Sequence, residues 1–211
     1  MPSRNRIKQY SADAYYHIYN RGVEKREIFL DDADYSKFLS LLERHLSGEE
    51  WEDKRGRSYI DLSKEVELLA YCLRPNHIHL LLYQIDPEGM TRLLRRVMTA
   101  YSMYFNLKYD RVGGLFQERF KAALIFDEKH LWHISRYIHL NAIPPGAKFE
   151  NPEHHRYSSY RYYQGQLRAP WIRPDRILAM HAEMGESYEE FMRDYADYRA
   201  SWAQVEPLLA L

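Results

Sequence analysis

A strand–turn–strand pattern in the middle of the chain limits its fold more than any other feature. Two apolar runs, 66–73 and 77–84, flank the short spacer Arg74-Pro75-Asn76. Pro and Asn favour tight turns, so the spacer predicts a β-hairpin. Alternation along the second run places His77 and His79 on one face of the strand and apolar residues on the other.

The segments that flank the hairpin predict two helices and two further strands. Residues 15–20 are aromatic and β-branched, as in strands, and Arg21-Gly22 follows them as a turn signal. Apolar residues recur at helical spacing from Tyr35 to Leu46 and from Met90 to Phe105, which predicts two amphipathic helices. A last strand is predicted with its core at 122–126.

The predicted order of elements is β-α-β-β-α-β, followed by a helix. That third helix is expected to begin at the capping residue Asp127 and to end at Pro144-Pro145-Gly146. The order is that of the split βαβ, ferredoxin-like fold, an antiparallel sheet with helices on one face. The predicted fold class is therefore α+β.

We expect one such domain over residues 1–150 and an extension over 151–211. Residues 151–173 are rich in Tyr and Arg and predict irregular wrapping. Residues 174–211 have a helix-like apolar stripe and carry 3 Lys or Arg against 8 Asp or Glu, whereas residues 89–125 carry 7 against 2. The acidic tail has three alternative roles: it covers a basic face, acts as an autoinhibitory flap or adds core, and added core is the simplest.

The composition excludes several classes of protein. A single cysteine, Cys72, excludes an internal disulfide framework and a Cys-rich zinc site. No apolar run is long enough to span a bilayer, and the first residues show no secretory signal, so we expect a cytoplasmic protein. Without a Walker loop, GxGxxG or GxSxG, we expect neither a nucleotide cofactor nor a serine nucleophile.

Two groups of polar residues are candidates for chemistry. His77 and His79, two apart on a strand, suit a divalent metal ion, although a half-polar sheet face also explains them. His133, Tyr137 and Asn141 form a polar stripe on the third predicted helix. A Tyr hydroxyl can act as a nucleophile and an amide oxygen as a metal ligand. In a chain with 19 tyrosines, Tyr137 is also explained as part of an amphipathic surface.

Basic residues gather in the same half of the chain. Arg119 and Lys121 flank Phe120, and basic residues interleaved with aromatic ones suit phosphate contacts and base stacking. Three more arginines lie on the polar face of the second predicted helix: Arg92, Arg95 and Arg96. A solvated helix face is the alternative interpretation of these three.

Five ordered stretches between residues 14 and 165 resemble one known family. They are Tyr19-Asn20-Arg21-Gly22, Tyr71-Cys72-Leu73-Arg74-Pro75-Asn76-His77-Ile78-His79-Leu80-Leu81, Gly114-Leu115-Phe116-Gln117-Glu118-Arg119-Phe120-Lys121, Arg136-Tyr137-Ile138-His139-Leu140-Asn141 and Tyr157-Ser158-Ser159-Tyr160. The second resembles the "MPNHxHLL" hallmark of single-tyrosine HUH transposases. Together they resemble the REP-associated tyrosine transposases, which are IS200-like.

The resemblance implies a ferredoxin-like HUH endonuclease core and a DNA strand-transfer reaction. By resemblance, Tyr137 is the nucleophile that attacks single-stranded DNA at a hairpin sequence, leaving a 5′-phosphotyrosine link and a free 3′-OH. His77, His79 and Asn141 are implied as ligands of Mg²⁺ or Mn²⁺. The implied partner is single-stranded or hairpin DNA, bound by a monomer or a homodimer. The residues we expect to contact DNA are Arg119, Lys121, Arg21, Arg74, Arg92, Arg95 and Arg96.

The sequence departs from the family pattern at two places. The usual "NPVRAG" run is Asn141-Ala142-Ile143-Pro144-Pro145-Gly146 here, so the third helix is expected to run one or two residues further. The methionine of "MPNH" is Arg74, which adds a candidate DNA contact. Neither change touches the four implied site residues.

Two other functions stay open at this point. The first is a domesticated module that binds DNA hairpins without cutting them. The second is a metal-dependent phosphohydrolase that uses water, in which Tyr137 is structural. A protein–DNA adduct distinguishes strand transfer from both.

Overall fold

The computed structural model describes residues 9–53, 55–141, 155–185 and 187–194. The strands are β1 (Ala14–Arg21), β2 (Val66–Arg74), β3 (His77–Gln84) and β4 (Lys121–Ile125). The helices are α1 (Asp32–Leu46), α2 (Gly89–Lys108), α3 (Glu128–Leu140), α4 (Tyr160–Tyr163), α5 (Asp175–Glu183) and α6 (Tyr188–Arg193), and a 3-10 turn spans Val23–Lys25. The predicted βαββαβ order followed by a helix is confirmed.

The four strands form one sheet in the order β2-β3-β1-β4, and all neighbours are antiparallel. This is the ferredoxin-like arrangement that the sequence predicts. β2 and β3 form the predicted hairpin, with Arg74 opposite His77 at its turn. β2 and β4 are the two edges of the sheet.

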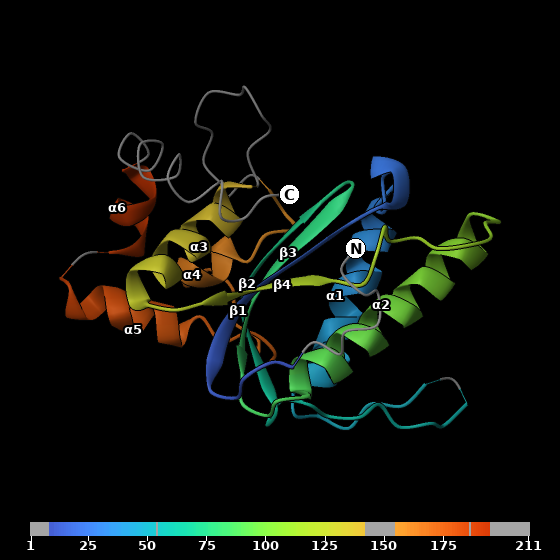
Figure 1. The fold of residues 1–211 in the computed structure, drawn as a ribbon, viewed down its shortest axis with the longest axis horizontal. Coiled ribbons are helices and arrows are strands. Elements are labelled where there is room, and N and C mark those ends of the chain that lie inside the picture. Colours follow the sequence, from blue (N-terminus) through green and yellow to red (C-terminus); the bar gives the residue numbers. More distant parts are fainter. Residues whose placement is uncertain (1–8, 54, 142–154, 186, 195–211) are drawn as a thin grey trace.

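Helices cover both faces of the sheet (Figure 1). α1 and α2 pack on one face, where Ile18, Ile78 and Leu80 share a core cluster with residues of both helices. This places the two helices of the βαββαβ unit together, as predicted. α3 lies on the opposite face, where Leu131 and other apolar residues pack against the sheet. The histidine face of β3 is therefore covered by α3.

Aspartates start two of the helices, as their positions in the sequence predict. The Asp31 carboxylate accepts from the backbone N–H of Asp34 and caps α1, and the Asp127 carboxylate accepts from the N–H of His130 and caps α3. α3 ends at Leu140, and its predicted stop at 144–146 lies outside the described residues. The Asp127 cap sets where α3 begins and so which of its residues face the sheet.

The described part of the acidic tail adds core to the domain. Ile177 of α5 and Tyr188, Phe191 and Met192 of α6 are buried in the same cluster as α3. Of the three expected alternatives, added core therefore describes α5 and α6. Residues 195–211 lie outside the described chain.

Candidate active site

The turns that carry the resemblance meet at one end of the sheet. The Gly22 N–H donates to the Asn76 carbonyl (2.9 Å), and the Gln117 N–H donates to the Arg21 carbonyl (2.9 Å). The Asn20 side chain donates to the carbonyl of the residue after Gln117 (3.0 Å). These bonds join the ends of β1 and β3 to the loop before β4, so three segments distant in sequence build one surface.

Gly22 is required by the closeness of this packing. A Cβ atom there would lie 2.3 Å from the Arg26 carbonyl oxygen and 2.9 Å from the Ile28 side chain. Those distances are too short for any non-bonded contact, so only glycine fits. The turn thereby keeps Arg21 beside His77, its partner in the β1–β3 register.

Three histidines lie on the sheet face under α3. His77 and His79 point to the same side, as predicted, with ring centroids 5.0 Å apart. β1 adds His17, whose Nε2 lies 3.0 Å from the Nδ1 of His79, and both rings are buried. His17 was not predicted; alternation along β1 puts it on this face, but only the β1–β3 register shows that it meets His79.

Tyr137 lies over this histidine cluster. Its ring packs nearly perpendicular to His79 (centroids 5.4 Å apart) and to His17 (5.7 Å). Asn141 follows one helical turn later, and its side-chain amide donates to the Tyr137 carbonyl (2.9 Å). The Asn141 side chain is also close enough to His77 to raise its pKa against the effect of burial. The structure thus brings together all four residues that the sequence nominates for chemistry.

Burial keeps the three imidazoles neutral. It lowers the pKa of His77 to about 4, helped by the charges of Arg74 and Arg21. Burial likewise lowers the pKa of His17 to about 3 and that of His79 well below its usual range. Neutral imidazole is the form that binds metal ions, so at pH 7 the three histidines are in the protonation state that metal binding requires.

The hydrogen bonds of the cluster suit metal ligation. The Nδ1–H of His77 donates to the Asn76 side-chain oxygen (2.6 Å), which leaves the Nε2 lone pair for a ligand. No group of three or more His, Cys, Asp or Glu in the described ranges is arranged to hold a metal. A metal site here therefore needs a ligand of another type, and the amide oxygen of Asn141, near His77, is the candidate.

Basic side chains flank the histidines. Arg21 and Arg74 are the register partners of His77 on its two neighbouring strands. Arg74 also donates to the Asn141 carbonyl at the C-terminal end of α3, where a positive charge is favourable. The Nζ atom of Lys121 lies 5.8 Å from the centre of the Tyr19 ring. Tyr19 is the register partner of His79.

The other predicted DNA contacts lie further away. Arg119 is exposed on the loop before β4, close enough to Tyr10 to affect its pKa. Arg92, Arg95 and Arg96 lie near the start of α2, on the opposite sheet face and at the opposite end from His77. Arg92 is ion-paired with Glu65 (2.9 Å) and Asp86 (2.7 Å). The structure does not bring these α2 arginines to the site.

Two residues of the matched stretch on α3, Arg136 and His139, hydrogen-bond the helix to other parts of the chain. The buried Arg136 donates to the Phe191 carbonyl (2.9 Å) on α6. His139 is within hydrogen-bond distance of the Tyr188 hydroxyl (2.7 Å) and the Ser159 hydroxyl (2.8 Å). Their place in the matched stretch was a signal, but no role was predicted for either residue. His133 lies one helical turn before Tyr137 on α3, and its ring is near Phe191.

Comparisons with known proteins give a matching family model and solved structures to which the chain is similar. A family model described as "Transposase IS200 like" matches residues 10–141. A solved structure, "Structure of the REP associates tyrosine transposase bound to a REP hairpin", is similar with a TM-score of 0.57 and 16% identity over 83% of this chain and 93% of that one. A putative transposase from Deinococcus radiodurans R1 is similar at TM-score 0.38 and 14% identity, covering 65% of this chain and 95% of that one.

No curated protein sequence matches the chain. No helix in the described ranges is long and apolar enough to cross a membrane.

Proposed function

The chain belongs to the IS200-like transposase family, and from that premise we propose that it cleaves and rejoins single-stranded DNA beside a hairpin, with Tyr137 as nucleophile. The observation that carries the proposal is the position of the Tyr137 ring against His79, with Asn141 one helical turn after Tyr137. A tyrosine, two imidazoles and an amide oxygen converge there, drawn from the start of one strand, β3, and from one helix, α3. That set suits phosphoryl transfer at a metal ion.

The proposed reaction exchanges one phosphate ester for another. The Tyr137 oxygen forms a bond to the scissile phosphorus and the bond from phosphorus to the 3′ oxygen breaks. The phenol releases one proton to solvent and the departing 3′ oxygen takes one up. The products are a 5′-phosphotyrosine and a free 3′-OH. The phosphotyrosine ester conserves the bond for later rejoining, which hydrolysis would not.

His77, His79 and Asn141 would hold Mg²⁺ or Mn²⁺. When bound, such an ion offsets the negative charge of the scissile phosphate. Arg21, exposed at the end of β1, is placed to bind a phosphate next to the scissile one. α3, fastened from behind by Arg136 and His139, keeps the phenol over the histidines.

The proposed substrate is DNA with a hairpin and a single-stranded flank. The solved neighbour of similar fold is described as bound to a REP hairpin. The described basic residues at the site end of the sheet, among them Lys121, are suited to a phosphate backbone.

The test is a trapping assay with Mn²⁺ and hairpin oligonucleotides labelled at the 3′ end, because that fragment stays joined to the tyrosine. Denaturing gels should show labelled protein for the wild type, none for Tyr137→Phe and none with a chelator. Tyr83→Phe is the matched control, since Tyr83 lies at the other end of β3 and should leave the adduct unchanged. Cleavage without labelled protein would instead show a phosphohydrolase, and a gel shift without cleavage would show a binding module.

A further inference from the structure

The outer edge of the sheet is lined by a segment that runs away from the site. We call residues 155–176 the edge segment. At the site end, the Leu73 N–H donates to the Tyr157 carbonyl (3.0 Å), and at the far end the Arg173 N–H donates to the Leu68 carbonyl (2.8 Å). Between them the Tyr163 hydroxyl donates to a β2 carbonyl (3.0 Å). The edge segment therefore follows β2 along its length.

The edge segment is strongly basic. It contains five arginines and one acidic residue, Asp175. Arg156 is ion-paired with Asp32 (2.9 Å), and Arg176 with Glu67 (2.6 Å). The other three arginines, Arg161, Arg168 and Arg173, have no ion pair within the described ranges; Arg161 donates only to the Gln166 side chain (3.2 Å). Three positive charges are thus left for an external anion.

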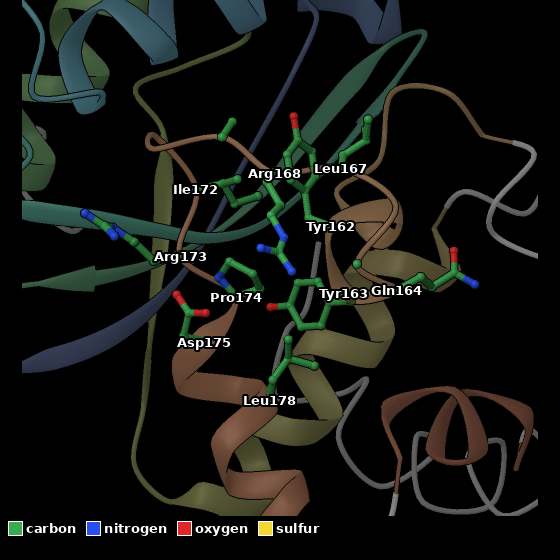
Figure 2. A pocket seen from close by; sticks show the side chains of 12 residues that line it. Tyr162, Tyr163, Gln164, Leu167, Arg168, Ile172, Arg173, Pro174, Asp175 and Leu178 are labelled. Carbon is green, nitrogen blue, oxygen red and sulfur yellow. The ribbon is translucent and has the colours of Figure 1, made fainter.

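One of these arginines occupies a hollow. The hollow has a volume of about 600 Å³ and lies between α4, the loop after it and the start of α5. In Figure 2 the Arg168 side chain reaches inward among the lining residues, whereas Arg173 points away from them. Asp175 also lines the hollow, but no ion pair joins it to Arg168. Arg168 and Arg173 are both exposed, and their side chains point in different directions.

We propose that the edge segment binds the duplex stem of the DNA hairpin through its phosphates, with Arg161, Arg168 and Arg173 as the contacts. This inference rests on the proposed function, because it names the surface that receives the hairpin.

The direction and length of the edge segment agree with those of a DNA stem. Leu68 and Arg74 are six residues apart on β2, which is about 20 Å. Successive phosphates of one strand are about 3.4 Å apart along the helix axis, so about six base pairs reach from the site to Arg173.

The positive charge of the edge segment favours the phosphates of a DNA duplex over a protein as its binding partner. The described partners of the edge segment neutralise only Arg156 and Arg176, which lie at its two ends. A duplex presents one negative charge about every 1.7 Å, which is the regular anionic lattice that spaced guanidinium groups fit. The sequence alone marked this stretch as Tyr- and Arg-rich without assigning it a partner.

The test is the salt dependence of hairpin binding. Fluorescence anisotropy would measure the Kd of a hairpin with a twelve-base-pair stem between 50 and 200 mM salt, with chelator present to prevent cleavage. The variant Arg161→Gln/Arg168→Gln/Arg173→Gln should lower the slope of log K against log salt by about 2.7, because each phosphate contact contributes about 0.9. Over this range the wild type should lose about 40-fold more affinity than the variant.

Three controls make the result specific. The variant Arg156→Gln/Arg176→Gln removes two arginines that already have carboxylate partners, and its slope should match the wild type. Arg161→Lys/Arg168→Lys/Arg173→Lys keeps the charges and should keep the slope, which also shows that the surface tolerates substitution. The single-stranded flank alone should bind all variants equally.

The outcomes separate the two proposals. If the wild type binds the hairpin tightly and the triple Gln variant keeps its slope, the edge segment does not bind the stem, and the proposed function stands. If the slope falls by the same amount in the triple Gln variant and in the paired-arginine control, the cause is a general charge effect. That result would also overturn the inference. If the wild type binds no hairpin, both proposals fail.

Discussion

The Nε2 atom of His17 lies 3.0 Å from the Nδ1 atom of His79, in the buried layer beneath Tyr137. This contact uses one nitrogen of His79 and leaves the other for the site. If His79 ligates a metal through Nε2, its Nδ1–H must donate to His17. A partner of this kind fixes the tautomer and orientation of a ligating histidine.

The first prediction follows from that contact. His17→Phe should weaken Mn²⁺ binding by about 10- to 100-fold, because His79 loses the partner that orients it. Isothermal titration of the protein without DNA measures the affinity. His45→Phe is the control, because His45 is equally buried but lies on the other sheet face and bonds the Ile60 carbonyl. Unchanged Mn²⁺ binding in the His17 variant would show that His17 serves only packing.

The second prediction concerns Asn141. Asn141→Ala should weaken Mn²⁺ binding, whereas Asn141→Asp should keep or strengthen it, since a carboxylate oxygen replaces the amide oxygen as a ligand. His77→Ala should abolish binding, because it removes a ligand and a neighbour of Asn141. An affinity that is the same in wild type and Asn141→Ala would remove Asn141 from the ligand set.

The third prediction is a loss of stability in acid. Burial lowers the pKa of His139 to about 3, so the folded state keeps it neutral while the unfolded chain takes up a proton below about pH 6.5. The stabilising contribution is complete above that pH and is lost as the pH falls toward the folded value. Between pH 7 and pH 5 the loss is about 2 kcal/mol for this one imidazole.

Urea unfolding between pH 7 and pH 5 measures this loss of stability. His17, also buried with a pKa of about 3, adds a loss of the same sign. His139→Gln should flatten the pH dependence by about one proton, because Gln does not titrate. A wild-type free energy of unfolding that is level from pH 7 to pH 5 would contradict the buried neutral state of these histidines.

The fourth prediction tests the turn at the end of β1. Gly22→Ala should destabilise the protein by more than about 2 kcal/mol, because its Cβ would meet the Arg26 carbonyl and the backbone must shift. Gly114→Ala is the matched control: its nearest neighbour would be at 3.6 Å, an ordinary contact, so the change should be within about 0.5 kcal/mol. Equal free energies of unfolding for the two variants would contradict the close packing of the turn.

The sequence predicted correctly where helices form and which residues of one strand share a face. Apolar spacing located α1 and α2, and alternation on β3 placed His77 and His79 on one face. Both follow from periodicity, which is a local property. The link from β3 to Tyr137 came from the resemblance, because no local pattern shows that α3 crosses the histidine face.

What the sequence did not predict depends on contacts between distant segments. His17 needs the β1–β3 register, and Arg136 needs α6, which lies some 55 positions further along the chain. The arginines of α2 were nominated by charge alone, which does not say which sheet face a helix covers. Tertiary packing decides these questions, and a single sequence carries little information about it.

The central claim is that Tyr137 forms the covalent bond to DNA, and peptide mass spectrometry tests it most directly. The trapped protein would be digested with nuclease and trypsin, and the peptide 137–148 examined, since Tyr137 is its only tyrosine among the 19 in the chain. We predict that this peptide carries the mass of a nucleotide joined through its 5′ phosphate. A nucleotide on any other tyrosine, or cleaved DNA with every tyrosine unmodified, would contradict the account.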